Sequence, residues 1–246
     1  MRQLLPDLLD HPDVAELYAA DHRPSPVDRP WVISNMIASI DGAAALDGVS
    51  GGLGGPGDKV VFSALRSVAD IIVAAAGTVR AEGYRPPRTP EAQQARRVAR
   101  GQQAVPRIAV VTGTLDLDLG GPLFGESPTR PIVITGTRPS PEQLARASEV
   151  ADVIVAGGDR VDLGDALRRL GTLGAGVVLC EGGPSLNGQL VAHDLIDECC
   201  VTISPLLAGG DAARIMHGVA PGVARPMRLA RVLAEGDMLL LRYVRP

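Results

Sequence analysis

The sequence predicts an α/β fold in which a mostly parallel central sheet carries helices on both faces. From Trp31 onward, short apolar runs alternate with amphipathic segments at the spacing of strand–helix–strand units. Runs such as DIIVAAA are typical of strands buried on both faces. Aromatic residues make up only 2% of the chain, so Val, Leu, Ile and Ala must build the core, which favours a helix-covered sheet over a β-sandwich.

The predicted elements follow the order of such units along the chain. Strands are expected at residues 31–38, 70–76, 107–112, 131–135, 152–156, 176–180 and 198–204. Helices are expected at residues 58–69, 140–148, 162–171 and 184–193, the first with Val61, Leu65 and Val68 on one face. The final apolar run, 238–244, is expected to form an edge or antiparallel strand.

Two segments fall outside this pattern. Residues 1–29 are expected to be an N-terminal extension, with two helical turns from Pro12 and the stiff connector RPSPVDRP, before a main domain at 30–246. Residues 81–106 interrupt the main domain with prolines and arginines. A connection of this length is usually functional or mobile, and a solvated basic loop is the alternative.

The composition excludes several classes of protein. A hydrophobic content of 46% argues against global disorder, and a net charge of −4 argues against a nucleic-acid binder. No apolar run approaches the roughly 18 residues that cross a membrane, and the acidic N-terminus is unlike a secretory signal. Cys180, Cys199 and Cys200 lie in apolar runs without metal-ligand spacing, so we expect reduced structural cysteines, no metal and a cytoplasmic location.

The segment EGGPSLNG (181–188) places a carboxylate at the end of a buried strand and glycines before a helix. Gly182 and Gly183 allow a ligand to approach the backbone, and the free N–H groups of the helix start attract phosphate. Glu181 lies where open α/β sheets bind ligands and suits a planar N–H edge such as that of a pyrimidine. The alternatives are a tight connection for the glycines and a helix-capping role for Glu181.

Two further strands end in turns of small residues. GVSGGLGGPGD (48–58) holds six glycines in eleven residues, which predicts a lid or a backbone lining against a flat cofactor, or else a flexible loop. IIVAAAGTVRAEGYRPPR (71–88) ends a strand in Ala-Gly-Thr, and its arginines Arg85 and Arg88 suit a phosphate ester. We expect these ends to converge on one cleft with EGGPSLNG.

The chain lacks the nucleophile elbow, the Walker A loop and a metal box. Hydride transfer suits such a site, because the cofactor carries the chemistry and the protein supplies orientation.

The motifs NMIASIDG (35–42), the glycine loop with Ser50, LRSVADIIVAAAGTVRAEGY (65–84), EGGPSLNGQLVAHDLIDE (181–198) and ISPLLAGG (203–210) occur in this order. With them the chain resembles the reductase domain of the riboflavin-biosynthesis deaminase-reductase family, in its stand-alone form, over residues 30 to 245. The resemblance implies a dihydrofolate-reductase-like fold and NADPH-dependent reduction of 5-amino-6-(5-phosphoribosylamino)uracil or its diaminopyrimidine precursor. It also implies hydride transfer to ribose C1′ of the imine form and a homodimer.

The resemblance assigns roles to individual residues. The catalytic positions are Asp41 and Glu181, although Asp41 is equally suited to fixing its turn. The substrate, a phosphorylated pyrimidine, would meet Asn35, Ser50, Arg66, Glu181 and, for its phosphate, Arg85 or Arg88. The NADPH site would be lined by Ala38, Gly52, Thr78, Glu82, Thr112, Gly182, Gly183, Pro184, Ser185, Leu186, Asn187 and Gly188.

The chain departs from the family pattern at several positions. The HxE and PCxxC pattern of the deaminase domain is absent from this sequence. Asn35 stands where the bacterial domain usually has lysine and the archaeal-type reductases more often have asparagine. Glu82-Gly83-Tyr84 replaces the Asp-Asp-Pro of bifunctional members. A pterin or dihydrofolate reductase and a non-catalytic nucleotide-binding module are the alternatives.

Overall fold

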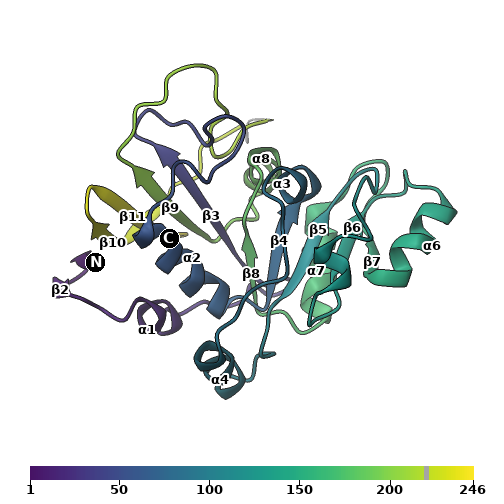
Figure 1. Ribbon diagram of the computed structural model, residues 1–246, viewed down its shortest axis with the longest axis horizontal. Helices are drawn as coiled ribbons and strands as arrows, with labels where there is room; N and C mark the ends of the chain where they lie inside the picture. Colours follow the sequence, from purple (N-terminus) through teal and green to yellow (C-terminus); the bar gives the residue numbers. More distant parts are fainter. Residues whose placement is uncertain (219–221) are drawn as a thin grey trace. The chain divides into compact units, whose positions relative to one another are not determined.

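A computed structural model describes residues 1–218 and 222–246 of the chain (Figure 1). The chain divides into two compact units. The first unit comprises Met1–Arg23, Trp31–Val68 and Leu179–Pro246, and the second comprises Pro24–Pro30 and Ala69–Val178. Strand β8 (Val177–Cys180) has its first half in the second unit and its second half in the first.

The first unit combines parallel and antiparallel pairing. Strand β3 (Trp31–Ser39) runs parallel to β9 (Glu198–Ser204), as expected for the centre of an α/β sheet. β11 (Met238–Val244) then lies antiparallel between β9 and β10 (Arg228–Glu235). β10 pairs with β1 (Arg2–Leu5), which pairs with the short β2 (Leu9–Asp10).

Helices of the first unit cover its strands. α1 (Val14–Ala19) begins at the N-cap Asp13, whose carboxylate accepts hydrogen bonds from two backbone N–H groups, and packs against α2 (Pro56–Val68). α2 buries Val61, Leu65 and Val68, as the sequence predicted, and lies against β11 (Figure 1). α8 (Pro184–Ala192) starts with proline in its first turn.

The second unit is a parallel α/β arrangement of four strands. β4 (Ile71–Ala75), β5 (Arg107–Val111), β6 (Ile132–Thr135) and β7 (Asp152–Val155) pair in that order, all in parallel. Its helices are α3 (Ala76–Ala81), α4 (Glu91–Ala99), α5 (Pro122–Gly125), α6 (Pro141–Val150) and α7 (Leu163–Thr172). Ser140 and Asp162 cap α6 and α7 at their starts.

The predicted fold class, α/β with a mostly parallel central sheet, is confirmed, and every predicted strand and helix is present. The run 238–244 is antiparallel as predicted, but it is not an edge strand, because β10 pairs with its outer side. β10 itself escaped prediction, since arginines interrupt its apolar pattern. Within the described residues, no helix has the length and apolarity needed to cross a membrane.

The segment 81–106 is not simply a solvated basic loop. Its second half forms α4, in which Arg97 is completely buried. The Arg97 guanidinium donates hydrogen bonds to the carbonyl oxygens of Ala69 (2.7 Å) and Gln103 (2.8 Å). Burial lowers the pKa of Arg97 to about 10. One arginine of the basic run is therefore a structural tie between α4 and the start of β4.

The N-terminal residues join the first unit through a buried charge cluster. The Glu198 side chain, fully buried at the start of β9, accepts bidentate hydrogen bonds from Arg23 (2.9 and 3.1 Å) and Arg242 (2.8 and 3.0 Å). Asp21 binds the same two arginines and Arg231. Residues 13–23 are thus fastened to β9, β10 and β11 by paired charges.

Replacing Glu198 with glutamine is expected to lower the free energy of unfolding by about 3–5 kcal/mol, because the buried guanidinium groups of Arg23 and Arg242 lose their counter-charge. Urea unfolding measures this change. Glu126→Gln is the matched control, since Glu126 and Arg85 are both largely exposed and 3.9 Å apart, and a pair of this kind contributes less than about 1 kcal/mol. Equal effects of the two substitutions would contradict the assignment.

The same substitution should flatten the acid side of the stability profile. Burial raises the pKa of Glu198, but Arg23 and Arg242 outweigh it and hold that pKa below its ordinary value of 4.5. The stabilisation is therefore complete above pH 4.5 and is lost as the pH falls through the lower pKa of the folded protein.

Candidate active site

The turn after β3 is organised by the carboxylate of Asp41. The Asp41 Oδ2 atom accepts hydrogen bonds from the backbone N–H groups of Gly209 (2.7 Å) and Ala208 (3.1 Å), and Oδ1 accepts one from the hydroxyl of Ser39. The Ser39 hydroxyl in turn accepts one from the Ala43 N–H (2.9 Å). The hydrogen bonds from Ser39, Gly209 and Ala208 lower the pKa of Asp41 to about 2. Asp41 is thus a fixed anion that ties two loops together.

The glycine loop between β3 and α2 has an ordered anchor. Leu53 is 1% exposed and packs with Ile37, Leu46 and Met238. The flexible-loop alternative therefore does not describe this segment as a whole. Gly52 is exposed and lies against the Leu46 side chain, while Ser50 is half-buried. Ser50 and Gly52 thus stand on an anchored turn.

Glu181, directly after β8, is bound by Arg66 in the last turn of α2. The Arg66 Nε and Nη2 atoms donate to the two carboxylate oxygens at 2.7 and 2.8 Å. The Glu181 side chain is 2% exposed and that of Arg66 is 22% exposed. The Arg66 guanidinium also lies 4.2 Å from the centre of the Phe62 ring. Glu181 therefore holds Arg66, and Arg66 is the member of the pair that reaches solvent.

Consecutive residues at the end of β8 serve opposite faces of the sheet, because side chains alternate along an extended chain. Glu181 meets α2, whereas the Cys180 thiol donates to the Asn187 side chain of α8 (3.2 Å). Burial raises the pKa of Cys180 to about 12, so this thiol is inert and structural. The three cysteines are free thiols, as predicted.

The start of α8 follows a sharply turned backbone. Gly182 has φ +91°, a conformation that favours glycine, and its Cα faces the Met36 sulfur. Gly183 is the N-cap, and the peptide between the two glycines is cis. Pro184 and Ser185 follow, with Ser185 exposed. Both glycines are buried and precede a nine-residue helix, and their predicted phosphate contacts stay predictions.

The later residues of α8 are engaged within the protein. Asn187 is fully buried and donates to the Ile215 carbonyl (3.3 Å). A Cβ atom on Gly188 would lie 2.0 Å from the His217 carbonyl oxygen, so this glycine permits close backbone packing. Leu186 belongs to the core. The structure thus gives Leu186, Asn187 and Gly188 internal contacts, and their predicted cofactor contacts stay predictions.

Three predicted cofactor residues lie in the second unit. Thr78 is in the short helix α3, directly after β4, and Glu82 is exposed at its C-cap. Thr112, directly after β5, is buried, and its Oγ1 accepts hydrogen bonds from the N–H groups of Thr114 (3.4 Å) and Leu115 (3.1 Å). Thr112 therefore shapes the turn that leaves β5.

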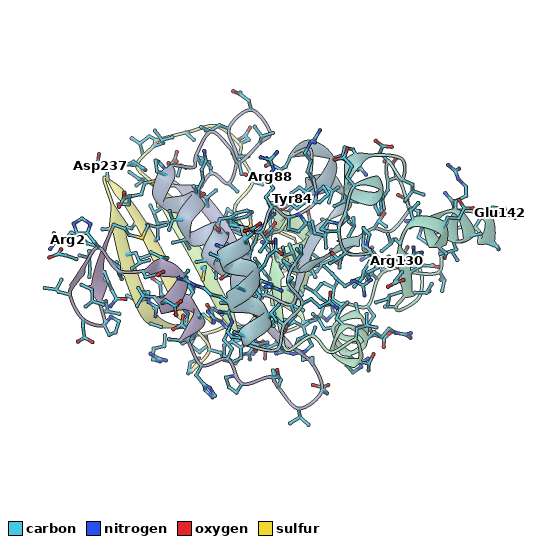
Figure 2. All side chains as sticks on the ribbon, turned by 60° about the horizontal axis from the view of Figure 1, so that its bottom comes forward. Arg2, Tyr84, Arg88, Arg130, Glu142 and Asp237 are labelled. Atoms are coloured by element: carbon cyan, nitrogen blue, oxygen red, sulfur yellow. The ribbon has the colours of Figure 1, made fainter. Side chains whose placement is uncertain are left out.

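The two predicted phosphate arginines also lie in the second unit, on the connection that follows α3. Both Arg85 and Arg88 are exposed, and Figure 2 labels Arg88 with its neighbour Tyr84. Arg85 is 3.9 Å from Glu126, a weak exposed pair. Both arginine side chains are therefore outside the core and accessible to a ligand, as binding of a phosphate would require.

Several predicted residues of the first unit lie at three separate locations. Asp41 is at the turn after β3, Ala38 and Asn35 are on β3, and Glu181 with Arg66 joins β8 to α2. The expectation that Asp41, Thr78 and Gly183 share one cleft stays a prediction. Sequence reasoning missed Ser39 and His217. Ser39 lies within NMIASIDG, but no local pattern distinguishes His217.

Comparison with known proteins identifies the family. The model of the RibD C-terminal domain matches residues 30–241 of the chain. The chain belongs to this family. A Methanothermobacter thermautotrophicus protein named 2,5-diamino-6-ribosylamino-4(3H)-pyrimidinone 5′-phosphate reductase is 31% identical, over 87% of this chain and 98% of its own length. A protein of the same name from Archaeoglobus fulgidus is 26% identical, over 88% and 100%.

A solved structure agrees with this assignment. A pyrimidine reductase-like protein from Corynebacterium diphtheriae superposes with a TM-score of 0.84 and 25% identity. The superposition covers 95% of this chain and 98% of that protein. The sequence-based resemblance to the riboflavin-pathway reductases is therefore confirmed at the level of the family and the fold.

Separating Arg66 from Glu181 should impair catalysis with little effect on NADPH. Glu181→Gln and Arg66→Ala each remove a charge-assisted bidentate contact of roughly 1.5–3 kcal/mol, so kcat/KM for the pyrimidine should fall about 10- to 100-fold. The kcat/KM of the double variant should be no lower than that of the more impaired single variant, because both substitutions break the same interaction. Steady-state kinetics and NADPH titration measure the two effects.

Arg169→Ala is the control for this pair, since it removes an exposed ion pair with Asp165 on α7. It should leave kcat/KM unchanged. Wild-type turnover by Glu181→Gln would remove Glu181 from the substrate site, and a large loss of NADPH affinity would assign the pair to the cofactor instead.

Proposed function

We propose that the protein is an NADPH-dependent reductase of riboflavin biosynthesis, acting on 2,5-diamino-6-ribosylamino-4(3H)-pyrimidinone 5′-phosphate or its deaminated uracil counterpart. The observation that carries the proposal is the family match over residues 30–241, together with relatives of that name aligned over nearly their whole length. The diaminopyrimidinone is the preferred substrate, because these relatives are named for it. Asn35, in place of the lysine of the bacterial domain, agrees with this choice.

The residues present suit a nicotinamide dinucleotide. The first turn of α8 follows two buried glycines, and its N–H groups are the groups we assign to the pyrophosphate. The Met36 side chain lies against Gly182, so the exposed part of this turn is at Ser185. Ser185 is exposed in the same first turn and adds a hydroxyl. In the second unit, Thr78 lies in α3, the short helix directly after β4, and Glu82 is the C-cap of α3. When bound, NADPH supplies the hydride that reduces ribose C1′ of the ring-opened imine.

The chain's own residues orient the substrate. Arg66 lies at the end of α2, where its Nε and Nη2 atoms are bound to Glu181, its guanidinium is stacked on Phe62, and its side chain is partly exposed. We assign it to the pyrimidine side of the substrate, with Glu181 as the group that fixes its direction. Asp41 has a pKa of about 2, so it stays ionised at neutral pH and is a poor proton donor. Its proposed role is to position the turn after β3.

The decisive experiment supplies each candidate substrate with NADPH and follows the nicotinamide absorbance. Consumption with the phosphorylated diaminopyrimidinone and none with dihydrofolate supports the proposal. Turnover of dihydrofolate alone would replace it with a folate-type activity. NADPH binding without turnover of any pyrimidine would indicate a nucleotide-binding module.

Removing the second-unit arginines should abolish recognition of the phosphate. Arg85→Ala combined with Arg88→Ala should lower kcat/KM for the phosphorylated substrate about 100-fold, as expected for the loss of about 3 kcal/mol of charge-assisted contact. Activity on the dephosphorylated analogue should change little. The matched control is Arg96→Ala with Arg100→Ala, which removes two exposed arginines, one in α4 and one at its C-cap. Equal losses on both substrates would exclude a phosphate contact.

A homodimer is the second part of the proposal, and an apolar sheet face supports it. On the face opposite the buried Leu240 and Thr202, alternate residues of β9 and β11 are half-buried or exposed. They are Leu239, Leu241 and Tyr243, paired in register with Ile203, Val201 and Cys199. A contiguous apolar surface of this kind is typical of an interface.

A cytoplasmic location is also proposed, in keeping with the free thiols.

Sedimentation analysis of Leu239→Lys tests the dimer. Leu239 is 41% exposed within the apolar face, so a charge there should weaken association at least tenfold, through loss of roughly 1.4 kcal/mol or more. Leu173→Lys, at a 52% exposed leucine after α7, should leave the dimer intact. A wild-type protein that is monomeric at micromolar concentration would contradict the proposal.

A further inference from the structure

The loop at residues 206–217, which follows β9, joins the turn after β3 to the first turns of α8. Both of those elements carry predicted ligand contacts. We infer that Asp41 is a positioning residue, which holds the first turn of α8 in its cofactor-binding arrangement through the 206–217 loop. The inference rests on the proposed function, in which that turn meets the phosphates of NADPH.

The loop is anchored at its beginning by Asp41 and its neighbours. The Asp41 carboxylate binds the N–H groups of Ala208 and Gly209, and Gly209 has φ +63°, so two successive N–H groups point at one anion. The Ile40 N–H donates to the Leu206 carbonyl (3.0 Å) and the Ala44 N–H to the Ala213 carbonyl (2.9 Å). Three points along the loop are therefore tied to the segment 40–44. Charge-assisted contacts such as those of Asp41 are the strongest of these ties.

The far end of the loop lies against α8. The His217 N–H donates to the Pro184 carbonyl (3.2 Å), and the His217 ring is 3.0 Å from the Ser185 hydroxyl. Asn187 donates to the Ile215 carbonyl, and Gly188 leaves room for the His217 carbonyl. The first two turns of α8 are thus in contact with residues 215–217. Ser185 in particular takes its orientation from His217.

The two ends are therefore linked through one short segment. Releasing the Asp41 contacts removes the strongest tie and leaves the loop held to the segment 40–44 by the backbone hydrogen bonds at Leu206 and Ala213. We expect the contacts of residues 215–217 with Pro184 and Ser185 then to form for only part of the time. A binding site that is competent for a fraction of the time has an apparent Kd raised by the inverse of that fraction. A positioning role for Asp41 therefore shows as weaker NADPH binding, not as a loss of the chemical step.

The test uses two substitutions at opposite ends of the loop in the full chain. Asp41→Asn removes the charge that holds Ala208 and Gly209, and Gly188→Ala forces the His217 carbonyl away from α8. Each is expected to raise the Kd of NADPH about tenfold, which corresponds to a competent fraction of about one tenth. The Kd of NADPH for the double variant should agree within about twofold with the higher of the two single-variant values, because both substitutions act through one loop.

Matched controls separate this effect from general damage. Asp47→Asn changes an exposed aspartate in the turn closed by Leu46 and Val49. Gly171→Ala places a methyl group in the helix α7, 3.5 Å from Pro30, which is ordinary contact. Both should keep the wild-type Kd. A merely structural role for Asp41 would lower the melting temperature and the folded fraction, but the remaining folded protein would keep its NADPH affinity.

Hydrogen exchange gives a readout that does not depend on the cofactor. In Asp41→Asn, backbone amides of residues 206–217 and of the first turn of α8 should exchange faster than in the wild type. Faster exchange confined to residues 206–210, an unchanged Kd, or a double variant whose losses multiply to about 100-fold would each overturn the inference. If Asp41→Asn does not fold, Gly188→Ala tests the same link from the α8 end, because coupling between two sites is reciprocal. The amides of Ala208 and Gly209, which bind Asp41, should then exchange faster, and unchanged exchange there would overturn the inference.

Failure of the proposed function gives a different result. If the wild-type protein does not bind NADPH at all, the cofactor assignment is wrong. The exchange of the first turn of α8 in Asp41→Asn then still decides whether Asp41 positions that turn. Unchanged exchange there would overturn the inference in that case also.

Discussion

The first unit depends on the ion pairs that the buried carboxylate of Glu198 makes with Arg23 and Arg242. This carboxylate lies at the start of β9, where Cα partners in β3 and β11 are Ile33 and Val244, and two guanidinium groups satisfy both its oxygens. Removing these charges from water costs free energy, which offsets much of the attraction between them. The ion pairs therefore matter for the position of β9 as much as for the stability of the fold. They fix the place of β9 between its neighbours. The 206–217 loop follows the opposite end of β9 and contacts the turn after β3.

The two ends of the β3–β9 pair use charge for different purposes. At the buried end, Arg23 and Arg242 neutralise Glu198 and attach the N-terminal residues. At the carboxyl end, where open α/β sheets bind ligands, Asp41 is exposed and is stabilised by backbone N–H groups instead of a cation. The first arrangement serves the core, and the second orders loops that must remain accessible.

Glu181 and Arg66 illustrate how a site residue is prepared before a ligand arrives. A guanidinium and the edge of an aminopyrimidine are both planar N–H donors, so the carboxylate that suits one also suits the other. The fold places Arg66 against both Glu181 oxygens and against Phe62, which limits its rotamers. Pre-organised donors of this kind lose little freedom on binding. Glu181 therefore has an internal partner in Arg66, and its predicted contact with the substrate stays a prediction.

The sequence by itself determined most of the elements and the family. Apolar periodicity located β3, α2 and α8 within one or two residues, because buried strands and amphipathic helices have local patterns. The order of NMIASIDG and EGGPSLNG carried the family resemblance. Only the tertiary structure decided the pairing of those elements and the partners of each charge. Arg97 looked solvated and is buried, and Gly188 looked ligand-facing and faces His217. The run that forms β11 was predicted as an edge or antiparallel strand, and it is antiparallel with a partner on each side. These outcomes depend on residues distant in the chain, since a charge or a glycine carries no local sign of what will pack against it.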